Sequence, residues 1–182
     1  LYGKVDTAIV GPPEDARGDE IVRQLAAGGA RIVHGVQGLS GSLGAANWSV
    51  LWPASGHPGM QSGNPGSVTL LVQQPGLSSL FLGDLGEEAQ NALLASTPLP
   101  HVDVVKVAHH GSADQSATLY ERIHARIDVV SVGADNSYGH PTGKTLDLLQ
   151  RLGGIILRTD LAGMVSVSVR ADELSLWSEH GG

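Results

Sequence analysis

The sequence predicts a mixed α/β fold in a single domain that covers residues 1–182. Short β-branched runs alternate with segments whose apolar residues recur at helical spacing, a pattern typical of a sheet covered by helices. A length of 182 residues is enough for one domain with its own core. The chain contains no cysteine, so any metal ion has to be held by His, Asp or Glu.

The first elements form a strand–helix–strand unit. We expect a strand at 5–10, a helix at 15–27 that ends at Gly28-Gly29, and a second strand at 31–34. Residues 38–66 hold many glycines around one apolar strand, Trp48–Trp52. This glycine-rich segment is too apolar for a flexible linker, so we interpret it as a site loop or an insertion and place no domain boundary there.

From Ser67 onward strands and helices alternate regularly, beginning with a hairpin across Pro75-Gly76. The predicted strands are 68–73, 77–82, 102–107, 128–132, 155–157, 164–169 and 174–177, and the predicted helices are 87–94, 117–125 and 142–152. We expect the last three strands to close the sheet.

Potential metal ligands follow three of these strands. Asp84 comes just after strand 77–82, His109 and His110 follow strand 102–107, and His140 lies in the loop after strand 128–132. Sites in open α/β sheets assemble at the carboxyl ends of the strands. One Asp with two or three His suits Zn²⁺ or another divalent ion, which lowers the pKa of bound water to about 7. The pattern therefore predicts hydrolysis with a metal ion.

Other interpretations of the same residues are open at this stage. Taken by itself, Asp84 after a glycine is typical of a turn in which Asp caps the next helix. His140 before Pro141 is compatible with a plain loop residue ahead of a helix. A serine hydrolase would use Ser112 as nucleophile, His109 or His110 as base and Asp84 to orient it, but it leaves the remaining histidines without a role.

Five segments carry a resemblance to a known family: 64–67 (NPGS), 81–84 (FLGD), 104–112 (VVKVAHHGS), 131–141 (SVGADNSYGHP) and 158–163 (RTDLAG). In order and spacing they resemble the C-terminal metallo-β-lactamase-like domain of the ComEC competence (DNA-uptake) protein family. The resemblance implies a four-layer αββα sandwich joined to a membrane channel domain in the same protein. It also implies a nuclease-type hydrolase that degrades the non-transported DNA strand, on the extracytoplasmic face of the membrane.

The resemblance also implies roles for individual residues. Asp84 would bridge two metal ions, Zn²⁺ or Mn²⁺, and His140 would bind the second of them. His109 and His110 would act as metal ligands or as donors to the transition state. The residues implied to line the substrate site are Asn64 and Ser112.

One family feature has no counterpart in this chain. A His-x-His-x-Asp-His-like signature, which supplies most ligands of the first metal, occurs nowhere in the sequence. We therefore expect a fold that is incomplete on its N-terminal side, weak or absent metal binding and no hydrolysis by this chain by itself. Apolar surface left exposed on that side is expected to favour self-association.

Charge and hydropathy limit the possible partners. The formal net charge is −7, and no basic run that would track a phosphate backbone is present, so tight DNA binding by this chain is not expected. No apolar stretch is long enough for a bilayer span, so we expect this chain to be soluble. The resemblance implies that it is a soluble domain of a membrane protein. Two further functions are compatible with the sequence: a non-catalytic module that binds nucleic acid or a partner protein, and another hydrolase of the superfamily, such as a phosphorylcholine esterase.

Overall fold

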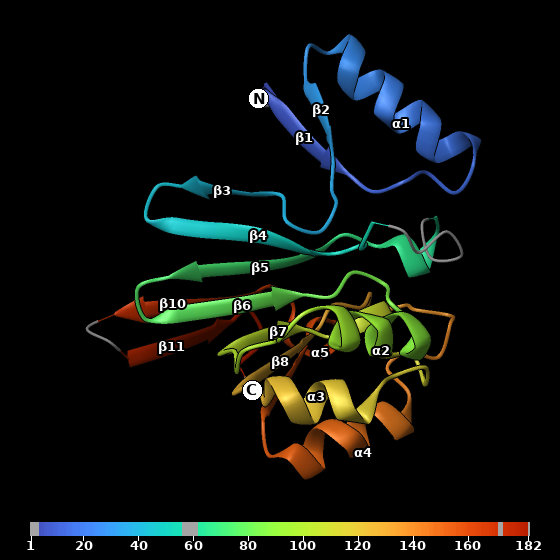
Figure 1. Cartoon of the computed structure of the whole chain (residues 1–182). Coiled ribbons are helices and arrows are strands. Elements are labelled where there is room, and N and C mark those ends of the chain that lie inside the picture. Colours follow the sequence, from blue (N-terminus) through green and yellow to red (C-terminus); the bar gives the residue numbers. More distant parts are fainter. Residues whose placement is uncertain (1–3, 56–61, 171–172, 182) are drawn as a thin grey trace.

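In the computed structural model, which describes residues 4–55, 62–170 and 173–181, the chain has a mixed α/β fold (Figure 1). Its elements in chain order are β1 (Thr7–Val10), α1 (Ala16–Ala27), β2 (Arg31–His34), β3 (Ser40–Leu43), β4 (Ala46–Trp52), β5 (Thr69–Gln74), β6 (Leu77–Phe81), α2 (Glu87–Ser96), β7 (Val104–Lys106), α3 (Ala117–Ile123), β8 (Ile127–Val130), α4 (Gly143–Leu152), β9 (Ile155–Arg158), α5 (Thr159–Ala162), β10 (Val165–Arg170) and β11 (Glu173–Ser178).

The main sheet has seven strands in the order β3-β4-β5-β6-β7-β8-β9. Its first four strands run antiparallel to one another, and β6 to β9 run parallel. The predicted hairpin across Pro75-Gly76 is confirmed as the β5–β6 pair. The glycine-rich segment holds two strands, β3 and β4, where the sequence predicts one. The four-residue β3 is exposed throughout and lacks the apolar pattern that would reveal it.

The prediction that the last strands close this sheet is wrong for two of them. β9 pairs with β8, but β10 and β11 form a separate antiparallel hairpin, and β1 and β2 form a separate parallel pair. After β9 the chain turns through the short helix α5 and Gly163, which has φ +66. A period-2 pattern identifies a strand and its buried face but does not specify which strand it pairs with.

Helices α2, α3 and α4 cover one face of the main sheet (Figure 1). The fully buried side chains of this layer include Leu93 from α2, Tyr120 from α3 and Leu149 from α4, and they pack with Leu80 of β6 and Val105 of β7. These contacts form the hydrophobic core and fix the carboxyl ends of the parallel strands relative to one another.

Several large apolar side chains are exposed. They include Phe81 of β6, Ile155 of β9, and Leu43, Met164 and Trp177. Phe81 alternates with the buried Leu80 along β6, so it lies on the face of the sheet away from α2, α3 and α4. Self-association through such surface stays a prediction. Of the helices in the described ranges, none has the length and apolarity that crossing a membrane requires.

Candidate functional site

Three neighbouring parallel strands end at the same edge of the main sheet. Because β6, β7 and β8 are adjacent and parallel, the segments that follow them meet there. A pocket of about 740 Å³ opens at this edge, and its lining includes Asp84, His109, His110 and His140. The fold thus brings together all four side chains that the sequence singles out as metal-ligand candidates.

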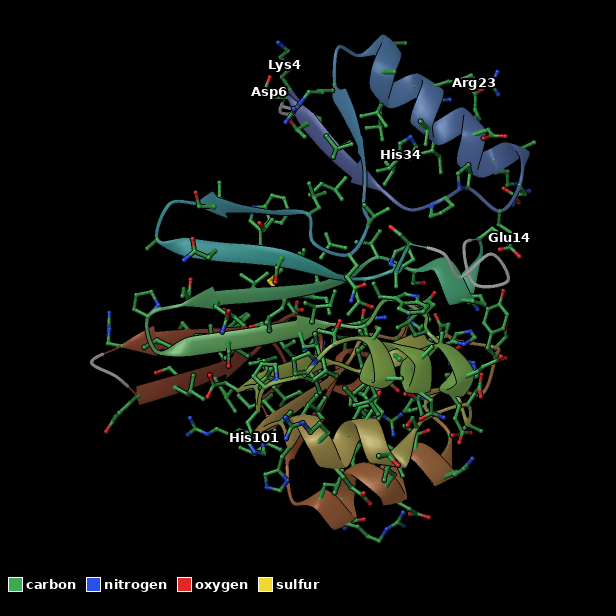
Figure 2. The ribbon with its side chains drawn as sticks, in the orientation of Figure 1. Lys4, Asp6, Glu14, Arg23, His34 and His101 are labelled. Carbon is green, nitrogen blue, oxygen red and sulfur yellow. The ribbon has the colours of Figure 1, made fainter. Side chains whose placement is uncertain are left out.

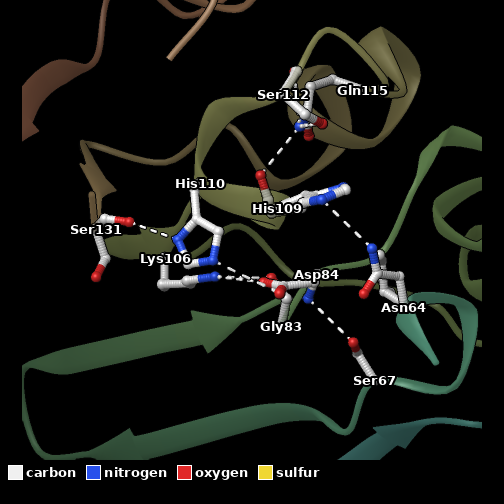
Figure 3. A network of polar contacts seen from close by, with 12 residues as sticks. Asn64, Ser67, Gly83, Asp84, Lys106, His109, His110, Ser112, Gln115 and Ser131 are labelled. Carbon is white, nitrogen blue, oxygen red and sulfur yellow. Dashed lines mark hydrogen bonds and ion pairs between the residues drawn. The ribbon is translucent and has the colours of Figure 1, made fainter. Parts of the chain in front are cut away.

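The Asp84 carboxylate faces a lysine and a histidine (Figure 3). Its Oδ1 lies 3.3 Å from Nζ of Lys106, and its Oδ2 lies 3.6 Å from Nε2 of His110. Helix α2 starts after Gly86 and receives no side-chain cap, so the interpretation of Asp84 as a helix cap is wrong. The Asp84 carboxylate therefore lines the pocket and does not cap a helix.

The backbone before Asp84 requires glycine. Gly83 has φ +59, and a Cβ added to it would lie 2.6 Å from Cβ of Ser67. The Ser67 hydroxyl accepts a hydrogen bond from the backbone N–H of Asp84 at 3.1 Å, and Lys106 donates to the carbonyl of Gly83 at 2.8 Å. These contacts orient the carboxylate towards the pocket.

The two adjacent histidines adopt an uncommon backbone conformation. Both His109 (φ +46) and His110 (φ +54) are left-handed, within the 3-10 segment Ala108–Gly111. Non-glycine residues occupy this region rarely, and the strain persists only where surrounding contacts hold it. The N–H of His109 donates to the carbonyl of Gly83 at 3.1 Å, which ties this turn to the Asp84 loop.

A buried polar network supports the histidine turn from below. The Tyr120 hydroxyl accepts from the N–H of Ala108 at 3.1 Å and donates to Oε1 of Gln115 at 2.8 Å. Gln115 donates to the carbonyl of Ala108 at 3.0 Å, and Gln90 donates to Oε1 of Gln115 at 3.1 Å. Burial raises the pKa of the Tyr120 hydroxyl, which therefore remains a donor. The sequence does not predict this network, because no local pattern distinguishes a buried glutamine from an exposed one.

Ser112 belongs to this supporting layer. It is only 5 % exposed, its hydroxyl accepts from Nε2 of Gln115 at 3.3 Å, and it is not part of the pocket lining. The structure therefore does not bring Ser112 together with the four pocket residues, and its implied substrate-lining role stays a prediction.

The contacts of His110 define its proton positions. Its Nδ1 lies 2.6 Å from the carbonyl oxygen of Ser131 (Figure 3). A carbonyl only accepts, so Nδ1 carries a proton, and Nε2 is the ring nitrogen that faces Asp84. Metal-binding histidines commonly donate their second nitrogen to a backbone carbonyl in this way.

His109 and His140 complete the histidine side of the pocket, with ring centroids 5.7 Å apart. Nδ2 of Asn64 lies 3.3 Å from Nε2 of His109. Nδ1 of His140 is buried and has no hydrogen-bond partner among the described residues. A Cβ on Gly111 would lie 2.7 Å from Cβ of Pro141, so the two histidine-bearing loops pack closely.

The residue types of this pocket suit a divalent metal ion, but their arrangement does not form a ligand set. Three imidazoles and a carboxylate are suitable donors. Within residues 4–55, 62–170 and 173–181, however, no group of three or more His, Cys, Asp or Glu side chains is arranged to hold an ion. His57, in the glycine-rich segment, lies outside the described residues.

The fold and site together define a mixed α/β domain with a His/Asp pocket at its strand ends. Comparison with curated proteins confirms the resemblance to the ComEC competence proteins. The chain is similar to ComE operon protein 3 of Bacillus subtilis, with 34 % identity over 109 residues, or 59 % of this chain. It is also similar to recombination protein 2 of Haemophilus influenzae, with 29 % identity over 114 residues, or 62 % of this chain.

The matched segment spans 14 % of the length of each of these relatives. No family model matches the chain. Among solved structures, the chain is similar to one described as a metal-dependent hydrolase from Parabacteroides distasonis, with a TM-score of 0.48 and 14 % identity, over 81 % of this chain and 63 % of that one.

Proposed function

We propose that residues 1–182 form the C-terminal part of a metallo-β-lactamase-like αββα domain, a metal-dependent phosphodiesterase of a DNA-uptake protein. The observation that carries this proposal is the pocket at the ends of β6, β7 and β8, where Asp84, His109, His110 and His140 meet. Similarity to ComE operon protein 3 and recombination protein 2 supports DNA as the substrate. We propose further that the domain belongs to a membrane protein and lies on its extracytoplasmic face.

The metal would be held by side chains with free donor atoms. Asp84 offers a carboxylate, His110 offers Nε2, and His140 has a buried nitrogen with no partner among the described residues. A bound divalent ion would polarise a phosphoryl oxygen and lower the pKa of a water molecule. Because no three donors in the described part of the chain are arranged to hold an ion, we propose that this chain supplies only part of the ligand set.

The chain's own residues would orient the reacting groups. The Ser131 carbonyl accepts from Nδ1 of His110, so this contact orients the ring and leaves Nε2 as the nitrogen that would bind the metal. Lys106, on Oδ1 of Asp84, balances the charge of the carboxylate and restricts its rotation. Asn64 donates to His109, and this contact sets the tilt of that ring.

The first experiment measures metal binding by this chain. We expect weak binding of Zn²⁺ or Mn²⁺ in calorimetric titration, with NMR shifts confined to the pocket histidines, and no DNA cleavage. Asp84→Asn should remove the shifts of His110. Asp135→Asn, which changes an exposed carboxylate in the same lining, should leave them unchanged. One tightly bound zinc per chain, or cleavage that EDTA abolishes, would contradict the partial ligand set.

The second experiment uses the whole protein in which this chain is joined to its channel domain. Loss of a residue that only supports a metal ligand lowers activity roughly 10- to 100-fold. In the whole protein, Asp84→Asn removes a proposed ligand itself, so it should lower metal-dependent DNA cleavage by more than this. Asp135→Asn is again the matched control. Full cleavage by the Asp84→Asn protein would show that catalysis does not depend on this pocket. No metal-dependent cleavage by the unmodified protein would favour a module that binds nucleic acid or a partner without catalysis.

A further inference from the structure

The loop between β8 and α4 holds a strongly exposed aromatic residue at the pocket. Tyr138 is 84 % exposed and lines the same pocket as Asp84 and His110. We propose that Tyr138 stacks on a nucleobase and so positions single-stranded DNA across the pocket. This inference rests on the proposed phosphodiester substrate and adds a binding residue that acts on the base rather than on the phosphate.

The loop that carries Tyr138 is internally braced. Oδ1 of Asn136 accepts from the N–H of Tyr138 at 3.0 Å, and Nδ2 of Asn136 donates to the carbonyl of His140 at 2.5 Å. The N–H of Asn136 donates to the carbonyl of Gly133 at 3.2 Å. One asparagine therefore holds both sides of Tyr138, and the loop presents the ring without support from the hydrophobic core.

Tyr138 also lies against a site histidine. Its ring is nearly parallel to that of His140, at an interplanar angle of 18° and a centroid distance of 6.4 Å. An aromatic ring that is held on a loop and mostly accessible to solvent is suited to stacking, because every base offers a π-face. The stack would place the sugar–phosphate backbone next to the pocket.

The charge of the chain makes stacking important for binding. Two carboxylates, Asp84 and Asp135, line the pocket, and the net charge is −7. Attraction of phosphates, which dominates most binding of nucleic acid, is therefore weak here. Contacts to the bases have to supply a larger share of the affinity, without preference for one base over another.

The test compares two labelled oligonucleotides of equal length, an oligothymidylate and an abasic strand, by fluorescence anisotropy at low salt. The wild-type chain should bind the oligothymidylate about 5- to 100-fold more tightly than the abasic strand, the range expected for one stacked base. Tyr138→Ala should abolish this difference, and Tyr138→Phe should retain it. Trp177→Ala, which removes an exposed aromatic side chain outside the pocket lining, is the matched control and should behave as wild type.

The outcomes separate this inference from the proposed function. Asp84→Asn, which removes the proposed catalysis, should keep the preference for the base-bearing strand. Equal affinity of the wild-type chain for both strands, or no binding of either, would overturn the stacking role whatever the metal experiments give. A Tyr138→Ala protein that keeps the preference but changes its sedimentation would instead assign the ring to a protein contact.

Discussion

Helix α1 and the layer of α2, α3 and α4 lie in very different surroundings. The Asp15 side chain caps α1 by accepting from Arg17 and Gly18 at 2.9 and 3.0 Å, as Thr142 caps α4. Yet α1 has no buried residue, whereas α2, α3 and α4 each bury side chains against the main sheet.

The β1–α1–β2 unit stands apart from the main sheet in Figure 2, where Lys4, Asp6 and Arg23 mark its outer surface. Capping and periodicity mark where α1 begins and ends, but a helix buries side chains fully only where another surface covers it. Most of the stability should therefore reside in the layer of α2, α3 and α4, next to the site.

The largest effect is expected from truncating a core residue of this layer. Leu149→Ala in α4 removes a fully buried side chain and should lower the free energy of unfolding by about 2–5 kcal/mol. Urea denaturation measures this loss. The conservative Leu149→Met should cost less than about 1.5 kcal/mol. If Leu149→Ala behaves as wild type, α4 is not part of the cooperative core.

A second effect depends on pH. Asp128 of β8 is buried on the same face as Val105, and burial raises the pKa of its carboxyl from 3.8 to about 7. Between these values the folded chain holds a proton that the unfolded chain has released. Stability should therefore fall as the pH rises from about 4 to about 7, and then level off.

Asp128→Asn removes this titration. Urea titrations across the pH range measure the free energy of unfolding of both proteins. The variant should become more stable relative to wild type as the pH rises to about 7. Other carboxyls titrate in both proteins and cancel in the comparison. A difference that is constant with pH would show that Asp128 is ionised in the fold at all of these pH values.

A smaller effect is expected from the α1 cap. Asp15→Ala removes the acceptor for two N–H groups and should weaken α1 by about 0.5–2 kcal/mol. Because α1 buries no residue, faster hydrogen exchange should appear in its first turn while the global urea midpoint stays constant. Asp15→Asn keeps the cap and is the control. A lower global midpoint for Asp15→Ala would mean that the unit unfolds together with the main sheet.

The smallest effect is expected on the exposed side of α1. Ile21 is 59 % exposed, so Ile21→Ala should change the free energy of unfolding by no more than about 0.5 kcal/mol. Paired with Leu149→Ala in the same urea experiment, it compares the two regions directly. A loss as large as that of Leu149→Ala would reveal a partner surface that covers α1 in solution.

Much of the fold could be predicted because its signals are local. The helix at 15–27 and the hairpin across Pro75-Gly76 follow from periodicity, caps and turn residues. Strand β3 could not be predicted because its four residues are all exposed and show no apolar alternation, and helix α5 because four residues are too few to show a helical period. The separation of β10–β11 from the main sheet depends on pairing that no local pattern encodes.

The site shows the same division. Asp84, His109, His110 and His140 could be singled out because each follows a predicted strand or lies in the loop after it, and the parallel order of β6, β7 and β8 then brings them together. The burial of Ser112 and the network of Gln90, Gln115 and Tyr120 could not be foreseen. A hydroxyl or an amide has the same chemistry on the surface and in the core, and only packing decides between them.

By itself, the sequence determined the residue types of the site, their order along the chain and the strands that carry them. The tertiary structure decided three things: that Asp84 pairs with Lys106 and does not cap α2, that Nδ1 of His110 carries a proton, and that Tyr138 stands exposed on the pocket. The two kinds of information differ in the sequence separation over which the interactions act. Propensities and caps act over a few residues, whereas Asp84 and Lys106 are 22 positions apart and are brought together by the pairing of β6 with β7.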